Sequence, residues 1–129
     1  NFLERANLNY FIGSNSVKKR IMLGLKKVDL NNFFLEDKIY SFDTVNIPKP
    51  HPDIYLAAIE KNNLDKDETL IIEDSEVGVI AGVKAGVKVI GFTAGGHWYP
   101  DRSKKELLEA GATLIIDNYT TLLEEIKKI

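Results

Sequence analysis

The chain has 129 residues, of which 44% are hydrophobic and 28% charged, and its formal net charge is −2. These values predict one globular domain over residues 1–129. The net charge gives no reason to expect a nucleic-acid partner. No apolar run approaches the ~20 residues of a membrane span. The absence of cysteine excludes disulfides and thiolate metal sites. We therefore expect a soluble, cytoplasmic protein without a nucleic-acid or membrane partner.

Strand and helix signals alternate along the chain. Short apolar runs between turn residues predict strands at 8–13, 38–42, 69–73, 88–92 and 112–117. Apolar spacing and start signals predict helices at 16–28, 53–61 and 76–85, and two more from the capping-box patterns Ser103-x-x-Glu106 and Thr121-x-x-Glu124. Five strands alternating with helices predict an α/β fold with a doubly wound parallel sheet.

An acid pair, Glu73-Asp74, closes the predicted strand 69–73 where the chain enters a helix. The carboxyl ends of parallel strands are where α/β proteins place their ligands. Burying two carboxylates is costly unless they pair or bind a metal, and hard oxygen ligands suit Mg²⁺. A helix N-terminus would explain one acid better than two. We favour a Mg²⁺ site, with the helix-terminus role as the alternative.

Two other segments carry polar groups suited to phosphate. Ser14, in the turn GSNS at 13–16, could hold an anion together with backbone amides at a helix N-terminus, although this turn taken alone is better explained as a helix cap. Lys49 lies between two prolines, which stiffen its backbone. A rigidly held ammonium suits a phosphoryl group, whereas a lone lysine is more often a solvated surface residue.

Three further candidates carry weaker signals. Asp65-Lys66-Asp67 has the Asp-x-Asp spacing of a phosphoaspartyl nucleophile and its acid/base partner, but no buried strand precedes it, so we expect a solvated connection at the opposite edge of the sheet. His51 and His97 have no metal-ligand companion at useful spacing. His97 belongs to the glycine-rich loop at 93–102, which is expected on the ligand edge.

The motifs GSNS at 13–16, KPHPDIY at 49–55 and IIEDSEVGV at 71–79, followed by KAGVKVIGF at 84–92, occur in this order. In this combination the chain resembles the haloacid dehalogenase (HAD) superfamily, in particular its β-phosphoglucomutase-like and phosphoglycolate-phosphatase-like branch. The resemblance implies a Rossmann-like core and a Mg²⁺-dependent phosphatase or phosphosugar mutase, which acts on a small phosphorylated metabolite through an aspartyl-phosphate.

The same resemblance assigns roles to individual residues. Ser14 becomes the phosphate-binding hydroxyl, with Asn15 beside it. Lys49 becomes the catalytic lysine that steadies nucleophile and phosphate. Glu73 and Asp74 become the Mg²⁺-binding acids.

The chain departs from the family's pattern in what comes before Ser14. The family's first motif, an Asp-x-Asp-Gly-Thr-like segment that ends the first strand, is absent, and so is the helical cap; those aspartates are the nucleophile and the general acid/base. In this fold the missing strand lies at the centre of the sheet, between the strands that end at Gly13 and Asp74, so two strand edges lack partners. We therefore expect residues 1–129 to be the C-terminal portion of a longer enzyme, inactive without its N-terminal segment.

Two alternatives belong to other classes. A receiver-type signalling domain has a similar length and acidic residues at strand ends. It would need an acid pair after its first strand and a lysine after its last, whereas the predicted strands here end Gly13-Ser14 and Ile116-Asp117. The other alternative is a truncated, non-catalytic module that binds phosphate or metal.

Overall fold

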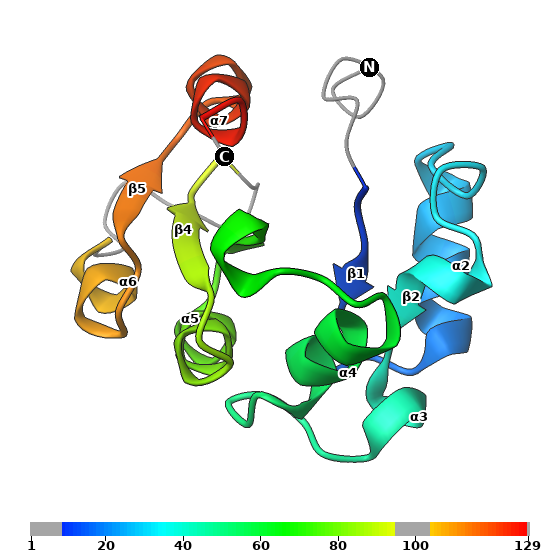
Figure 1. The fold of residues 1–129 in the computed structure, drawn as a ribbon. Coiled ribbons are helices and arrows are strands. Elements are labelled where there is room, and N and C mark those ends of the chain that lie inside the picture. Colours follow the sequence, from blue (N-terminus) through cyan, green and yellow to red (C-terminus); the bar gives the residue numbers. More distant parts are fainter. Residues whose placement is uncertain (1–8, 95–103, 129) are drawn as a thin grey trace.

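A computed structural model describes residues 9–94 and 104–128, and their strands and helices alternate as predicted. The strands are β1 (Ile12–Gly13), β2 (Ile39–Tyr40), β3 (Leu70–Glu73), β4 (Lys88–Phe92) and β5 (Leu114–Ile116). The helices are α2 (Lys18–Lys27), α3 (Phe42–Val45), α4 (Asp53–Lys61), α5 (Glu76–Lys84), α6 (Lys105–Glu109) and α7 (Tyr119–Ile126), with 3₁₀ turns η1 (Glu36–Lys38) and η2 (Lys66–Glu68). A strand lies within each predicted range, although β1 and β2 span only two residues each, and the fold is α/β (Figure 1).

Helices cover both faces of the strands (Figure 1). On one face, residues of α4, α5 and α6 pack against Ile71 and Val89. On the other, Leu122 and Ile126 of α7 pack against Ile90. Adjacent residues of a strand point to opposite faces, which is why Val89 and Ile90 contact different helices. The arrangement is the doubly wound one that the alternation of strands and helices predicts.

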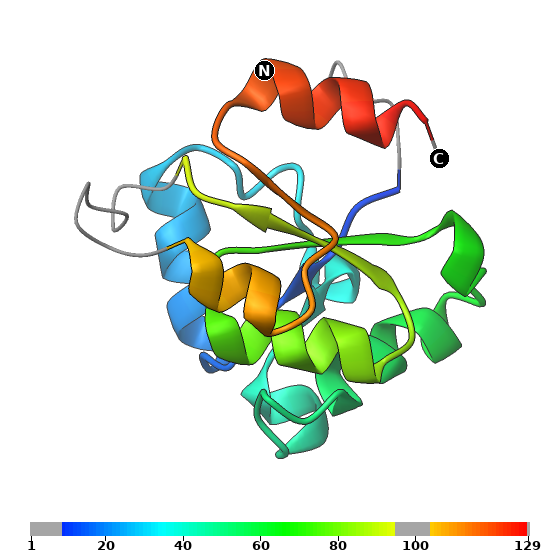
Figure 2. The ribbon, with the colours of Figure 1, turned by 90° about the vertical axis from the view of Figure 1, so that its left-hand side faces the viewer.

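All described strand pairs are parallel. In Figure 2 the strands run in one direction, so that their carboxyl ends share one edge of the molecule. Helix α5 begins at that edge, where the Ser75 hydroxyl accepts the N–H of Gly78 at 3.2 Å. The helix ends before Gly86, whose φ of +81° is the left-handed conformation expected there. Strand β3 and helix α5 therefore meet as the acid-pair motif predicts.

Several predicted boundaries are corrected. The strand predicted at 38–42 stops at Tyr40, because α3 begins at Phe42 and the Thr44 hydroxyl accepts the N–H of Ser41. The capping box predicted at Thr121 is wrong, since Asn118 caps α7 by accepting the N–H of Thr121 at 2.8 Å. Helix α6 begins at Lys105, and Ser103 lies outside the described residues.

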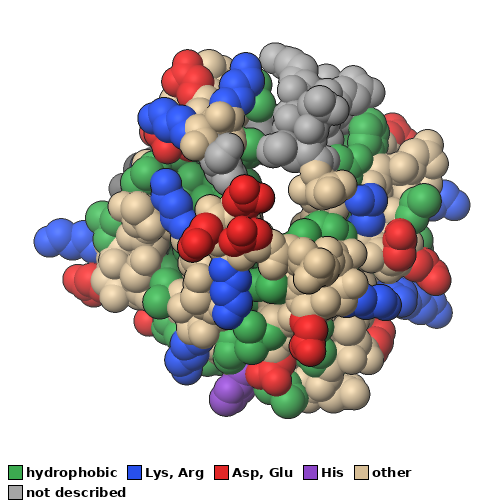
Figure 3. Space-filling view, viewed as in Figure 1, with side chains coloured by type: hydrophobic (Ala, Val, Ile, Leu, Met, Phe, Trp, Pro, Cys, Tyr) green, Lys and Arg blue, Asp and Glu red, His purple; other side chains and the backbone are tan. Residues whose placement is uncertain are grey.

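The described strands form two separate sheets, β2-β1 and β3-β4-β5. Between the edges of β1 and β3 lies a cavity of about 1230 Å³, here called the β1–β3 slot, and Figure 3 shows it as a hollow. Residues 10–12 and 70–72 line its two sides. Ile72 is 39% exposed although it lies within a strand, where parallel sheets are normally buried. The described residues thus leave the two facing strand edges unpaired, as expected for a fold without its central strand.

Within the described ranges, no helix is both long and apolar enough to cross a membrane.

Candidate functional site

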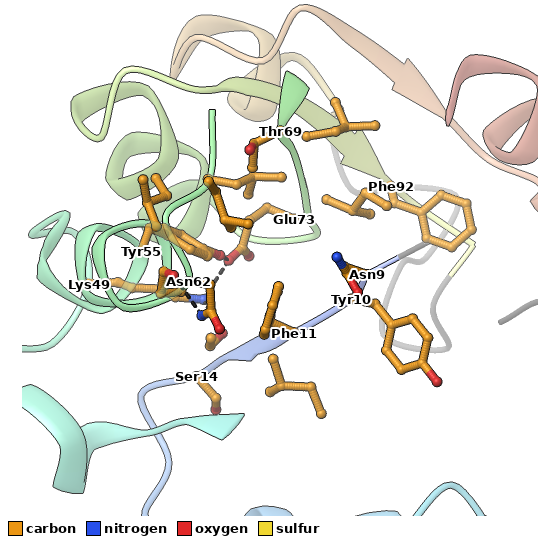
Figure 4. A pocket seen from close by; sticks show the side chains of 18 of the residues that line it. Asn9, Tyr10, Phe11, Ser14, Lys49, Tyr55, Asn62, Thr69, Glu73 and Phe92 are labelled. Atoms are coloured by element: carbon orange, nitrogen blue, oxygen red, sulfur yellow. Dashed lines mark hydrogen bonds and ion pairs between the residues drawn. The ribbon is translucent and has the colours of Figure 1, made fainter. Parts of the chain in front are cut away.

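The predicted site residues gather at one end of the β1–β3 slot, where β1 and β3 end. Ser14 directly follows β1, Glu73 is the last residue of β3, and Lys49 comes from the loop before α4. Figure 4 shows these three side chains around the slot, with Lys49 directed toward Glu73. Residues that lie up to 59 positions apart, from Ser14 to Glu73, therefore form one cluster at the carboxyl edge of the strands.

Lys49 connects the two sheets at this end of the slot. Its Nζ donates to the backbone carbonyl of Gly13 at 2.8 Å and to Glu73 Oε1 at 2.5 Å. The lysine side chain is only 9% exposed, so Lys49 is not a solvated surface residue. A charged amine is costly to bury, and here the carboxylate of Glu73 supplies the opposite charge.

Asn15 fixes the backbone of Lys49. Its Oδ1 accepts the N–H of Lys49 at 2.7 Å, and its Nδ2 lies 3.5 Å from the Lys49 carbonyl oxygen. The turn after β1 therefore orients the segment that carries the lysine. The family resemblance places Asn15 beside a phosphate; in the structure its side chain also holds the backbone of Lys49.

The Ser14 hydroxyl accepts the N–H of Ser16 at 3.1 Å and forms a local turn. Helix α2 starts four residues after Ser14, at Lys18, with Val17 at the N-cap position and no side-chain cap. The helix-cap explanation of Ser14 is therefore wrong. A hydroxyl that accepts one bond still has its own proton to donate, so Ser14 can donate to an anion at this edge.

Glu73 is 8% exposed and lies beneath the first turn of α5. Its Oε1 accepts from both the Lys49 ammonium and the Tyr55 hydroxyl. A Cβ at Gly78 would overlap the Glu73 carboxylate, so the glycine leaves the room that this acid occupies. Burial, and then the Glu73 carboxylate, raise the pKa of Tyr55 above its ordinary range, which keeps the tyrosine protonated as a donor.

Asp74, the second acid of the pair, is half-buried beside Glu73. Across residues 9–94 and 104–128, no three His, Asp or Glu side chains are grouped as a metal cluster. Mg²⁺ is commonly held by one or two carboxylates, with water and phosphate oxygens completing its shell. The donor chemistry of the two acids, Glu73 and Asp74, fits such an ion.

The other candidates lie elsewhere. Asp65-Lys66-Asp67 is exposed and precedes β3, where Asp65 caps η2 by accepting the N–H of Asp67 at 2.9 Å. The prediction of a solvated connection is confirmed. His51 is exposed, and His97 lies outside the described residues.

Tyr55 is the site residue that the sequence analysis missed. Tyr55 belongs to the KPHPDIY motif, but neither the spacing of the motif nor the family resemblance assigned a role to the tyrosine. The signal available was a polar hydroxyl beside Ile54 and Ala58, on the helix that begins at Asp53. That signal does not reveal its partner, because Glu73 lies 18 residues further along the chain.

Comparison with known proteins supports the same family that the motifs suggest. A family model described as haloacid dehalogenase-like hydrolase matches residues 1–92. The chain belongs to this family. Its motifs at Ser14, Lys49 and Glu73-Asp74 all lie within the matched range.

Three similar proteins indicate the range of haloacid dehalogenase relatives. A "phosphorylated carbohydrates phosphatase" of Thermotoga maritima is 28% identical over 127 residues, covering 97% of this chain and 56% of the relative. A HAD family hydrolase of Deinococcus radiodurans, solved with bound phosphate and sodium, is 31% identical with a TM-score of 0.86, covering 98% and 55%. A putative β-phosphoglucomutase of Thermotoga maritima is 26% identical with a TM-score of 0.81, covering 99% and 56%. The chain spans about half the length of these relatives.

Proposed function

We propose that residues 1–129 are part of the core of a Mg²⁺-dependent phosphatase or phosphosugar mutase that acts on a small phosphate ester. The observation that carries the proposal is the buried Lys49 ammonium, held between the Gly13 carbonyl and Glu73 at the end of an open slot. Such an ammonium can neutralise charge on a phosphoryl group. The names of the relatives support this class: one is a phosphatase of phosphorylated carbohydrates and another was solved with bound phosphate.

In this proposal the site residues divide the binding tasks among them. The Ser14 hydroxyl and the Lys49 ammonium bind phosphate oxygens, and Asn15 orients the lysine through its backbone. Glu73 and Asp74 hold Mg²⁺, which when bound would offset negative charge on the transferring phosphoryl group. The described side chains bind and polarise the phosphate but do not attack it.

The nucleophile comes from a segment that fills the β1–β3 slot. We propose that a strand inserted there ends in an aspartate beside Lys49. The aspartate oxygen attacks phosphorus, the bond to the ester oxygen breaks, and the departing alkoxide takes a proton from a general acid. Water, or a second hydroxyl in a mutase, then accepts the phosphoryl group from the aspartate. The cytoplasmic location expected from the sequence remains a prediction.

The test is Mg²⁺-dependent hydrolysis of p-nitrophenyl phosphate by an enzyme reconstituted from residues 1–129 and an N-terminal segment that supplies the slot strand. Asp74→Asn should lower kcat at least about 100-fold, because a neutral amide gives poor charge compensation to a metal. Asp117→Asn is the control, since Asp117 is an exposed acid after β5 at the same edge, and it should retain full activity. Near-normal turnover of Asp74→Asn at low Mg²⁺ would show that the metal assignment is wrong. A reconstituted protein without any hydrolysis would favour the non-catalytic module.

A further inference from the structure

Tyr55 touches three residues at the end of the slot, namely Gly13, Lys49 and Glu73. Its hydroxyl donates to Glu73 Oε1. The Lys49 Nζ lies over its ring, 4.9 Å from the ring centroid. Its Cε1 is so close to Gly13 that a Cβ there would come within 2.9 Å. One side chain from α4 therefore contacts the end of β1, the lysine and the end of β3.

These contacts restrain an ammonium that would otherwise be mobile. A lysine carries its charge on a flexible four-carbon stem. Two hydrogen bonds, to Gly13 and Glu73, fix the amine from two directions. The ring face of Tyr55 attracts the same cation from a third direction. The hydroxyl also orients the carboxylate of Glu73 that Lys49 contacts, through a bond to a charged acceptor of the stronger kind.

Packing alone does not explain this tyrosine. The core positions of α4 are Ile54, Ala58 and Ile59, which are 0%, 9% and 9% exposed. Tyr55 is only partly buried: its side chain packs against the core that includes Ile59 and also lines the slot, and a phenylalanine would keep that packing. Only the hydroxyl meets Glu73, and only an aromatic ring offers a face to the Lys49 cation.

We propose that Tyr55 is a positioning residue for phosphoryl transfer, which sets the place of the Lys49 ammonium through its ring and through Glu73. This inference rests on the proposed function, because it gives the lysine a phosphoryl group to act on. Displacement of a charged group by about 1 Å can cost about 100-fold in rate, since its stabilisation is needed at one place in the transition state. Tyr55 itself does not touch the substrate.

The kinetic test uses the reconstituted enzyme with Tyr55→Phe, Tyr55→Leu and a matched control, Tyr40→Phe. Tyr40 is also buried, and its hydroxyl accepts a neutral bond from Asn62 at 2.8 Å, so this control removes the same atom from another site. We expect Tyr55→Phe to lower kcat about tenfold and Tyr55→Leu about 100-fold, with KM changed less than about twofold, the pattern of an interaction expressed in the transition state. Tyr40→Phe should keep kcat within about twofold. Equal kcat values for Tyr55→Phe and Tyr40→Phe, or a loss that appears in KM alone, would overturn the proposal.

A spectroscopic test needs no activity. In isotope-labelled residues 1–129, the Lys49 Hε signals should be displaced by the ring current of Tyr55. The displacement should persist in Tyr55→Phe and in Tyr40→Phe and should be lost in Tyr55→Leu. If the signals are the same in Tyr55→Leu, the ring does not hold the lysine and the proposal fails, whatever the enzyme's activity. If the displacement behaves as expected but the reconstituted enzyme hydrolyses nothing, the fault lies in the proposed function, and Tyr55 holds Lys49 without serving phosphoryl transfer.

Discussion

The sharpest structural prediction concerns Gly78, the glycine in the first turn of α5 that faces the Glu73 carboxylate. Replacing a glycine within a helix by alanine normally stabilises a protein by about 0.5–1 kcal/mol, because less backbone entropy is lost on folding. At Gly78 the new Cβ overlaps the carboxylate, so Glu73 must rotate away from Lys49 and Tyr55. Breaking a buried ion pair costs about 3–5 kcal/mol when one partner is removed.

The cost at Gly78 is smaller than that limit, since both partners remain and water can reach them through the slot. Taking about 2–3 kcal/mol for the displaced carboxylate and subtracting the helix gain of about 1 kcal/mol, we expect Gly78→Ala to destabilise the chain by about 1–2 kcal/mol. Gly24→Ala is the control: Gly24 lies within α2, and a Cβ there meets nothing within 4 Å. That variant should be stabilised by about 0.5–1 kcal/mol.

Urea unfolding measures both changes. With a slope of about 2 kcal/mol per molar urea, the midpoints of the two variants should differ by about 1 M and lie on opposite sides of the parent chain. If Gly78→Ala is stabilised as much as Gly24→Ala, the Glu73 carboxylate does not occupy the place below α5, and the site geometry described here is wrong.

Three further predictions follow from the site and the fold. In the reconstituted enzyme, Lys49→Ala should lower kcat about 100-fold or more, because it removes a donor that stabilises the transition state. Lys66→Ala, at an exposed position before β3, should leave kcat unchanged. Equal effects of the two variants in a phosphatase assay would instead favour Asp65-Lys66-Asp67 as the candidate site. Residues 1–129 alone should not hydrolyse phosphate esters with Mg²⁺, and an added N-terminal segment should restore activity; turnover by the chain alone would refute the aspartyl-phosphate assignment. Asn118→Ala should lower the free energy of unfolding by about 1 kcal/mol through loss of the α7 cap, whereas Thr121→Ala should not. Thermal unfolding measures both variants; if Thr121 were the cap, Thr121→Ala would be the destabilised one.

The sequence was sufficient where local patterns decide the structure. The apolar run 70–72 followed by Glu73-Asp74 correctly predicted a strand that ends in an acid pair at the edge of the sheet. The three ordered motifs then identified the family, which the comparisons confirm. Each of these features depends on residues that are neighbours in the sequence, so each can be predicted without knowledge of the tertiary contacts.

The sequence alone was insufficient where the structural role of a residue depends on a contact with a distant part of the chain. Asn118 and Thr121 are both good capping residues, and only the path of the chain after β5 selects Asn118. Strand β1 is shorter than predicted because ladder bonds define a strand, and one edge of β1 faces the slot. The Tyr55 hydroxyl finds its acceptor on another element, so no spacing rule could have revealed it.

Helix α4 takes part in the cores on both sides of the slot. Its Ile54 and Ala58 pack with Tyr40 of β2, whereas its Ile59 packs with Ile71 and Val89 of the other sheet. Together with the Lys49 bonds, this helix links two units whose strands share no ladder. While the slot is open, the coupling between the two units depends on α4 and the Lys49 bonds rather than on strand pairing. A strand bound in the slot would add pairing on both sides, so that assembly of the substrate site and a gain in folding cooperativity would arise in the same event.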